Sequence, residues 1–181
     1  MIVNSRVYKL SLNDKNGLHH WNGGFVAFDN VNWDSYVLDK QVVMSHLSYN
    51  GNEGYPGFML TQVKYSWTDD NELHINICAT STKSTPVNIS NYCLFNLAGH
   101  GMGSKELKRH VVTVNSDRWI HRSCINNISI ESIRPVESTV FDLRSPTQFH
   151  KKRLAQVPKG GYDHIFCISS PNRWCYRFHA R

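Results

Sequence analysis

The feature that most constrains the fold of this chain is an alternation of side chains with a period of two residues. Along residues 59–67, the positions on one side of this pattern are Met59, Thr61, Val63, Tyr65 and Trp67. Residues 73–79 alternate in the same way, and the polar residues 69–71 connect the two runs. Because successive side chains of a strand point to opposite faces, this arrangement predicts an antiparallel β-hairpin.

Weaker alternation predicts further strands at residues 6–12, 36–47, 87–91, 110–115, 127–133 and 164–169. Residues 98–108 fit one short turn of helix, and no stretch has the periodicity of a long amphipathic helix. Many short strands with turn residues between them predict an all-β fold, either a sandwich or a barrel. Several of these strands carry polar residues on both faces, which suits a concave sheet face that lines a wet cleft.

Composition narrows the class of protein. With 181 residues, 40% of them hydrophobic, the chain has enough apolar side chain for a core, and we expect one domain over residues 1–181. No window approaches the roughly 20 apolar residues of a membrane-spanning helix, and the N-terminus lacks the apolar core of a signal peptide. We therefore expect no membrane partner.

The net charge of +6 does not point to nucleic acid. The basic clusters at residues 105–110 and 150–153 are short and fit a solvated face, and no nucleic-acid-binding motif accompanies them. Five cysteines without CxxC spacing fit reduced thiols, so we expect a cytoplasmic protein. The ten histidines include no pair at i, i+4 on a credible helix, so we expect no metal.

An unusual segment lies at residues 85–100, where Asn88, Asn91 and Asn96 interrupt an apolar run. A plain buried strand has no use for so many side-chain amides, whereas a site that orients a polyhydroxylated ligand does. Residues 85–99 read TPVNISNYCLFNLAG. They resemble the signature TPVNLTNHSYFNLAG of the aldose 1-epimerase (galactose mutarotase) family.

The resemblance continues in the order that the family has. Its further motifs lie at residues 3–13, 18–29, 48–57 (SYNGNEGYPG), 135–144 and 161–166 (GYDHIF). The family-like region covers about residues 3–168, and residues 169–181 resemble nothing in the family. The resemblance implies part of a large antiparallel β-sandwich of the galactose mutarotase type, truncated at both ends.

The family's reaction is mutarotation of a free aldohexose such as galactose or glucose. A glutamate removes the proton of the anomeric hydroxyl while a histidine protonates the ring oxygen, so one group acts as base and the other as acid. The resemblance implies no metal and no organic cofactor.

Tyr92 stands where the family has its general-acid histidine. A phenol, with a pKa near 10, is a poor match for moving protons in both directions near pH 7, although it can stack on a sugar or donate a hydrogen bond. Cys93 and Leu94 replace the family's small and aromatic pair, and we place Leu94 among the substrate-binding candidates.

Two other substrate-binding candidates come from the resemblance. His19 matches the family's sugar-binding histidine, but residues 20–22 look inserted, so His20 is an alternative and a surface loop histidine is another. Asp163 matches the aspartate that accepts hydrogen bonds from sugar hydroxyls, which suits a carboxylate. The alternative for Asp163 is a turn residue after two glycines.

Other parts of the family's machinery are expected to be absent. In the family, the sugar-binding arginine lies before the segment that matches the start of this chain, and Arg6 does not take over its role. The family's general-base glutamate lies beyond the segment that matches the end of this chain, and the turn residues Glu53 and Glu72 do not replace that glutamate. Gly54–Gly57 is interpreted as a tight turn, and Asp142 with Arg144 as a pair that ties strands. The hypotheses are an aldose 1-epimerase with impaired or absent catalysis, a non-catalytic carbohydrate-binding pseudoenzyme, or a non-functional fragment.

Overall fold

The hairpin predicted from the alternation is present in the computed structural model. β5 (Met59–Trp67) pairs with β6 (Leu73–Ser81) in an antiparallel ladder from Met59↔Ser81 to Trp67↔Leu73. The turn closes with a hydrogen bond from Thr68 N–H to Glu72 O at 2.9 Å, and Asn71 adopts a positive φ of 61°. Asn tolerates this left-handed conformation better than most residues, which is why the polar connection makes a turn.

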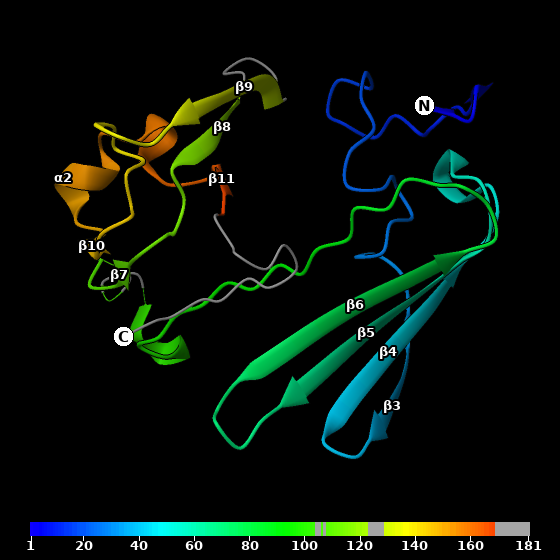
Figure 1. Cartoon of the computed structure of the whole chain (residues 1–181), viewed down its shortest axis with the longest axis horizontal. Coiled ribbons are helices and arrows are strands. Elements are labelled where there is room, and N and C mark those ends of the chain that lie inside the picture. The colour runs from blue at the N-terminus through cyan, green and yellow to red at the C-terminus, as the bar shows by residue number, and fades with distance from the viewer. Residues whose placement is uncertain (104–105, 107, 123–128, 169–181) are drawn as a thin grey trace. The chain divides into compact units, whose positions relative to one another are not determined.

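The structure describes residues 1–103, 106, 108–122 and 129–168. The chain forms two compact units, Met1–Tyr92 and Cys93–Arg181 (Figure 1). The all-β prediction is confirmed: strands dominate the described residues, and every pair of strands is antiparallel.

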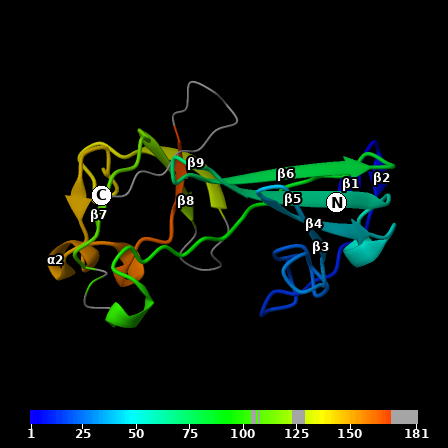
Figure 2. The same cartoon turned by 90° about the horizontal axis from the view of Figure 1, so that it is seen from below.

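The main sheet of the first unit has the strand order β3-β4-β5-β6. Its strands run side by side in both views (Figures 1 and 2). The single strand expected over residues 36–47 is wrong, because β3 (Asp34–Leu38) and β4 (Gln41–Ser48) are two strands of a hairpin. Leu38 pairs with Gln41, and Asp39 takes a positive φ of 53°, so two residues reverse the chain without a glycine.

One face of this sheet is covered by two segments that do not join a ladder. Phe28, Asp29 and Trp33 from one segment and residues 89–91 from the other line a small cavity together with residues of β4, β5 and β6. Trp33 Nε1 donates to Phe28 O at 2.9 Å, and Asn91 Nδ2 donates to the Tyr65 hydroxyl at 3.0 Å. The strand expected over residues 87–91 is therefore wrong, since this segment lies across the sheet face instead of pairing with an edge.

A short hairpin opens the chain. β1 (Ile2–Val3) pairs with β2 (Arg6–Val7), and Asn4 and Ser5 between them both have positive φ, 47° and 63°. Two consecutive positive φ values match the right-handed twist of the flanking strands. The strand expected over residues 6–12 ends at Val7.

The second unit holds a sheet of order β11-β8-β9 and the pair β10-β7. The bounds are β7 (Val111–Val112), β8 (Arg118–Arg122), β9 (Ser129–Pro135), β10 (Thr147–Gln148) and β11 (Ile165–Cys167). The short helical elements are η1 (Asn52–Gly54) in the first unit and η2 (His100–Met102), α2 (Lys151–Leu154) and η3 (Pro158–Gly160) in the second.

These elements correct or confirm the remaining predictions. The strand expected over residues 110–115 is limited to β7, and that over 164–169 to β11, with residue 169 outside the described residues. The strand expected over 127–133 corresponds to β9, while residues 127 and 128 lie outside the described residues. The helical turn expected within residues 98–108 is present as η2.

The core of the second unit is built from Trp119, Val136, Phe141 and Val157. Trp119 stacks on Phe141 with ring centroids 4.0 Å apart. Such an offset pair adds to the burial of both rings, which fixes the 136–144 loop against β8.

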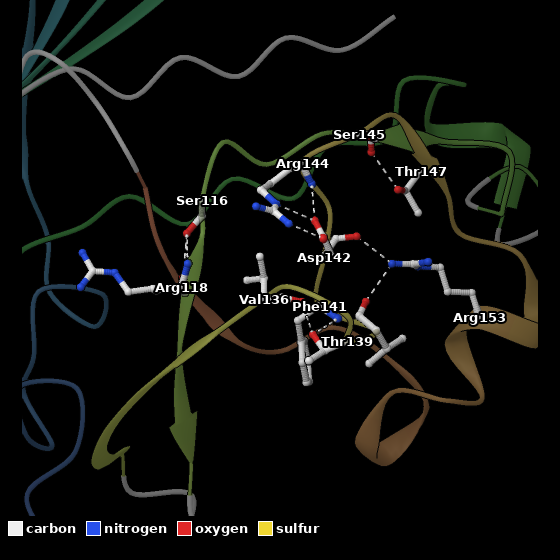
Figure 3. Close-up of polar contacts among 11 residues, drawn as sticks. Ser116, Arg118, Val136, Thr139, Phe141, Asp142, Arg144, Ser145, Thr147 and Arg153 are labelled. Carbon is white, nitrogen blue, oxygen red and sulfur yellow. Dashed lines mark hydrogen bonds and ion pairs between the residues drawn. The ribbon is translucent and has the colours of Figure 1, made fainter.

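Arg153 of α2 ties this loop down, as Figure 3 shows. Its Nη2 donates to Val140 O at 2.9 Å and to Asp142 O at 3.0 Å, and its Nε donates to the Tyr162 hydroxyl at 2.9 Å. The predicted Asp142–Arg144 pair is present at 2.7 Å, but it lies within one turn and joins no strands. The expectation that it ties strands is wrong.

In the part of the chain that the structure describes, no helix combines the length and apolarity needed to cross a membrane.

Candidate functional site

A cavity of about 690 Å³ lies within the first unit. Its wall comes from three segments, residues 20–29, residues 48–59 and residues 85–92, each of which belongs to a different sequence motif. This volume falls in the range of small-molecule sites, whose walls are largely apolar with a few polar groups. The fold thus brings three separate motifs to one cavity.

His20 lies in the cavity wall and is half-buried. Its Nδ1 is 2.7 Å from the backbone oxygen of Ser11, and its Nε2 is 2.8 Å from the hydroxyl of Tyr55. The rings of His20 and Tyr55 meet edge to face, with centroids 5.4 Å apart. Both ring nitrogens therefore have partners within the protein.

Glu53 is linked to the His20–Tyr55 pair through Ser11. Its carboxylate accepts a hydrogen bond from the Ser11 hydroxyl and another from Val26 N–H at 2.8 Å. These bonds, the Ser11 bond first among them, hold the pKa of Glu53 below its usual value. Glu53 is therefore a fixed negative charge at neutral pH.

The pKa of Tyr55 is shifted in the opposite direction from that of Glu53. Partial burial, followed by the negative charge of Glu53, raises the pKa of the Tyr55 phenol. The phenol therefore keeps its proton at neutral pH and is available as a hydrogen-bond donor.

The turn around Tyr55 explains how this residue is held. Gly51 N–H donates to Tyr55 O at 2.8 Å, and Gly57 N–H donates to Asn50 Oδ1 at 2.8 Å. Gly54 has a φ of +91°, and a Cβ there would overlap the backbone oxygen of Lys9. The tight turn predicted for Gly54–Gly57 is confirmed, and it directs Tyr55 into the cavity wall.

His19 has a different environment. It is exposed and is not among the residues that line the cavity. Its N–H donates to Asp14 Oδ1 at 2.7 Å, and this backbone bond is the main cause of the lowered pKa of Asp14. The backbone of His19 thus shapes a surface turn, while its neighbour reaches the cavity.

The other candidate site residues predicted from the sequence are divided between the two units. Tyr92 is among the residues that line the cavity, and the residue is 86% exposed. Leu94 is 95% exposed and Asp163 is exposed, and both belong to the second unit. Of the sequence candidates, the first unit therefore brings His20 and Tyr92 to one cavity.

Within the described residues, no three His, Cys, Asp or Glu side chains lie together in a way that could hold a metal ion.

Comparison with known proteins shows to which family the chain belongs. The family model described as aldose 1-epimerase matches residues 2–181. The chain belongs to the aldose 1-epimerase family. The match includes residues 169–181, so the expectation that these residues resemble nothing in the family is wrong.

Relatives agree with this family. Galactose mutarotase from Rattus norvegicus is 38% identical over 98% of this chain, and aldose 1-epimerase from Escherichia coli (strain K12) is 30% identical over 89% of it. The crystal structure of the GalM/aldose epimerase homologue from C. elegans superposes with a TM-score of 0.72 at 25% identity. That match covers 84% of this chain and 44% of the solved one, and it confirms the expected sandwich type.

The chain spans about half the length of the curated relatives it matches, since it covers 50% of the rat protein and 46% of the E. coli protein. Whether this chain has the activity of those whole proteins is therefore treated as a proposal.

Sequence reasoning missed Tyr55, which lines the cavity, Ser11, whose backbone oxygen contacts His20, and Glu53, which accepts from the Ser11 hydroxyl. Glu53 and Tyr55 lie in a stretch whose glycines and proline are explained by a turn. One signal was available, because the epimerase motif at 48–57 carries an acid and an aromatic residue two positions apart, and a turn requires neither.

Proposed function

We propose that this chain is an aldose 1-epimerase-like protein of hexose metabolism that binds a free aldohexose, galactose or glucose, and whose catalysis is impaired or absent. The observation that carries the proposal is the cavity of the first unit, whose wall joins three family motifs. Its polar wall residues include His20, Asn88 and Ser90, and apolar residues such as Phe28 lie between them. Such a mixture suits a sugar, which presents both hydroxyls and C–H faces.

The proposed loss of catalysis rests on Tyr92. The family's acid must give a proton to the ring oxygen and take it back when the ring recloses. An imidazole titrates near pH 6.5 and does both at neutral pH, whereas a phenol titrates near 10 and holds its proton too tightly. Tyr92 lines the cavity and contributes a ring and a hydroxyl for binding.

His20 is proposed to occupy the place that the family signature gives to its sugar-side histidine. His20 lines the cavity, and His19 does not. Leu94 and Asp163 are proposed as substrate-binding residues on the basis of their motif positions alone. For the cellular location we propose the cytoplasm, which is supported by the free thiols of Cys78 and Cys167.

Polarimetry and a binding assay test the two halves of the proposal separately. With freshly dissolved α-galactose or α-glucose, the purified protein is expected to leave the spontaneous rate of mutarotation unchanged. An acceleration that Asp163→Ala abolishes would overturn the proposed loss of catalysis. Ligand-observed NMR with galactose is expected to show saturable binding, and no binding at tens of millimolar would overturn the sugar-binding function and leave the fragment hypothesis.

A further inference from the structure

The hydrogen bonds of His20 determine which of its nitrogens carries the proton. The Nδ1 atom lies 2.7 Å from the backbone oxygen of Ser11. A carbonyl oxygen only accepts, so Nδ1 must be the donor in this bond. In the neutral imidazole, Nε2 then has a lone pair and no proton.

The second bond follows from the first. Nε2 is 2.8 Å from the Tyr55 hydroxyl, and with Nε2 as an acceptor the phenol must donate its proton. The rotation of the Tyr55 O–H is thereby fixed, and the phenolic oxygen is left with its lone pairs. His20, in contrast, has no nitrogen left for a ligand.

The residues behind this pair keep it in the same state. Glu53 accepts from the Ser11 hydroxyl and from Val26 N–H, so its charge stays close to the ring pair. That charge and the partial burial of Tyr55 raise the pKa of the phenol, which preserves the proton that the phenol donates. Each member of the chain Glu53–Ser11–His20–Tyr55 thus supports the next.

We propose that the Tyr55 hydroxyl oxygen is the group that accepts a hydrogen bond from the sugar at this wall, and that His20 is a positioning residue that orients it. This inference rests on the proposed sugar-binding function. It differs from the expectation drawn from the family signature, in which a histidine at this wall contacts the sugar. Both Tyr55 and His20 lie in the cavity wall, so the exchange of roles needs no movement of the chain.

The first test measures the tautomer directly in the ligand-free protein. Long-range ¹H–¹⁵N correlation spectra recorded at about pH 8 are expected to show the neutral imidazole of His20 with a protonated Nδ1 and a bare Nε2. The opposite tautomer would overturn the inference, because Tyr55 would then not donate to His20.

The second test compares two phenol deletions in a galactose titration followed by NMR. Tyr55→Phe is expected to weaken binding about fivefold, the effect of one lost hydrogen bond. Tyr49→Phe is the matched control, since Tyr49 is exposed, packs on Phe58 and does not line the cavity. Its affinity is expected to stay within about twofold of wild type.

The outcomes separate the two proposals. Unchanged or tighter binding by Tyr55→Phe would show that the Tyr55 hydroxyl is not the group that accepts from the sugar, and would overturn the inference alone. If the wild-type protein does not bind galactose, the sugar-binding function and the contact role of Tyr55 are both overturned. Backbone amide spectra of each variant verify that the fold is intact.

Discussion

The side-chain amide of Asn91 donates a hydrogen bond to the hydroxyl of Tyr65 at 3.0 Å. Tyr65 lies in β5, and Asn91 lies in the signature segment that crosses the sheet. This bond joins the segment that contributes to the cavity wall to the most regular part of the first unit. Of the three asparagines Asn88, Asn91 and Asn96, Asn91 therefore stabilises the fold through a side-chain hydrogen bond.

A double-mutant cycle tests the Asn91–Tyr65 bond. Asn91→Ala and Tyr65→Phe are each expected to lower the free energy of unfolding, and the double variant is expected to lose less than the sum. The coupling is expected to be about 0.5–1 kcal/mol, the usual net value of a hydrogen bond. Chemical denaturation of the four proteins measures it, and additive losses would show that the bond contributes nothing.

Gly24 offers a second prediction, because the carboxylate of Glu53 packs directly against it. Gly24 has a φ of +105°, and a Cβ there would overlap the Glu53 side chain. Gly24→Ala is therefore expected to lower the free energy of unfolding by about 2–4 kcal/mol, from backbone strain and from displacement of the carboxylate.

Gly17→Ala is the control for Gly24→Ala. Gly17 also has a positive φ, +64°, but a Cβ there meets no atom within 4 Å. Its expected cost is the strain alone, about 1–2 kcal/mol. Thermal unfolding of both variants measures the difference, and equal losses would contradict the close packing of Glu53 on Gly24.

Sequence reasoning predicted the fold best where local pattern and tertiary environment agree. The β5–β6 hairpin was predicted because one face is apolar and the connection is rich in turn residues. The β3–β4 hairpin was missed because Asp39 and Lys40 carry no glycine signal between two apolar runs. Residues 87–91 have the composition of a strand, but only tertiary structure decides whether such a segment pairs with an edge or lies across a face.

The same limit applies to the site. An inserted stretch at residues 20–22 made His19 and His20 equivalent in the sequence, and only the path of the loop separates an exposed imidazole from a cavity wall. The contact between Tyr55 and His20 joins residues 35 positions apart. No local pattern reports a contact of that range.

Arg153 gives a prediction for the second unit. Its guanidinium donates to the backbone oxygens of Val140 and Asp142 and to the hydroxyl of Tyr162. Arg153→Met removes three charge-assisted hydrogen bonds, although the Tyr162 hydroxyl still donates to Val140 O at 2.8 Å. The free energy of unfolding is therefore expected to fall by about 2–4 kcal/mol.

Lys152→Met is the matched control for Arg153→Met, since Lys152 precedes Arg153 in α2 and is exposed. Its effect is expected to stay within about 0.5 kcal/mol. Circular dichroism during thermal unfolding of the full chain compares the two, and a loss in the control as large as in Arg153→Met would mean that α2 itself, not the guanidinium, holds the loop.

The Asp142–Arg144 pair is expected to make the stability of the folded state depend on pH. The side-chain hydrogen bond from Arg144 is the main cause that lowers the pKa of Asp142 from 3.8 to about 2. A depressed carboxyl pKa stabilises the folded state above the unfolded value of 3.8, and this contribution is lost as the pH falls from about 4 to about 2. A ¹³C titration of the Asp142 carboxyl is expected to have its midpoint near 2 in the wild-type protein and to move towards 3.8 in Arg144→Gln. A wild-type midpoint close to 3.8 would show that the pair does not persist in solution.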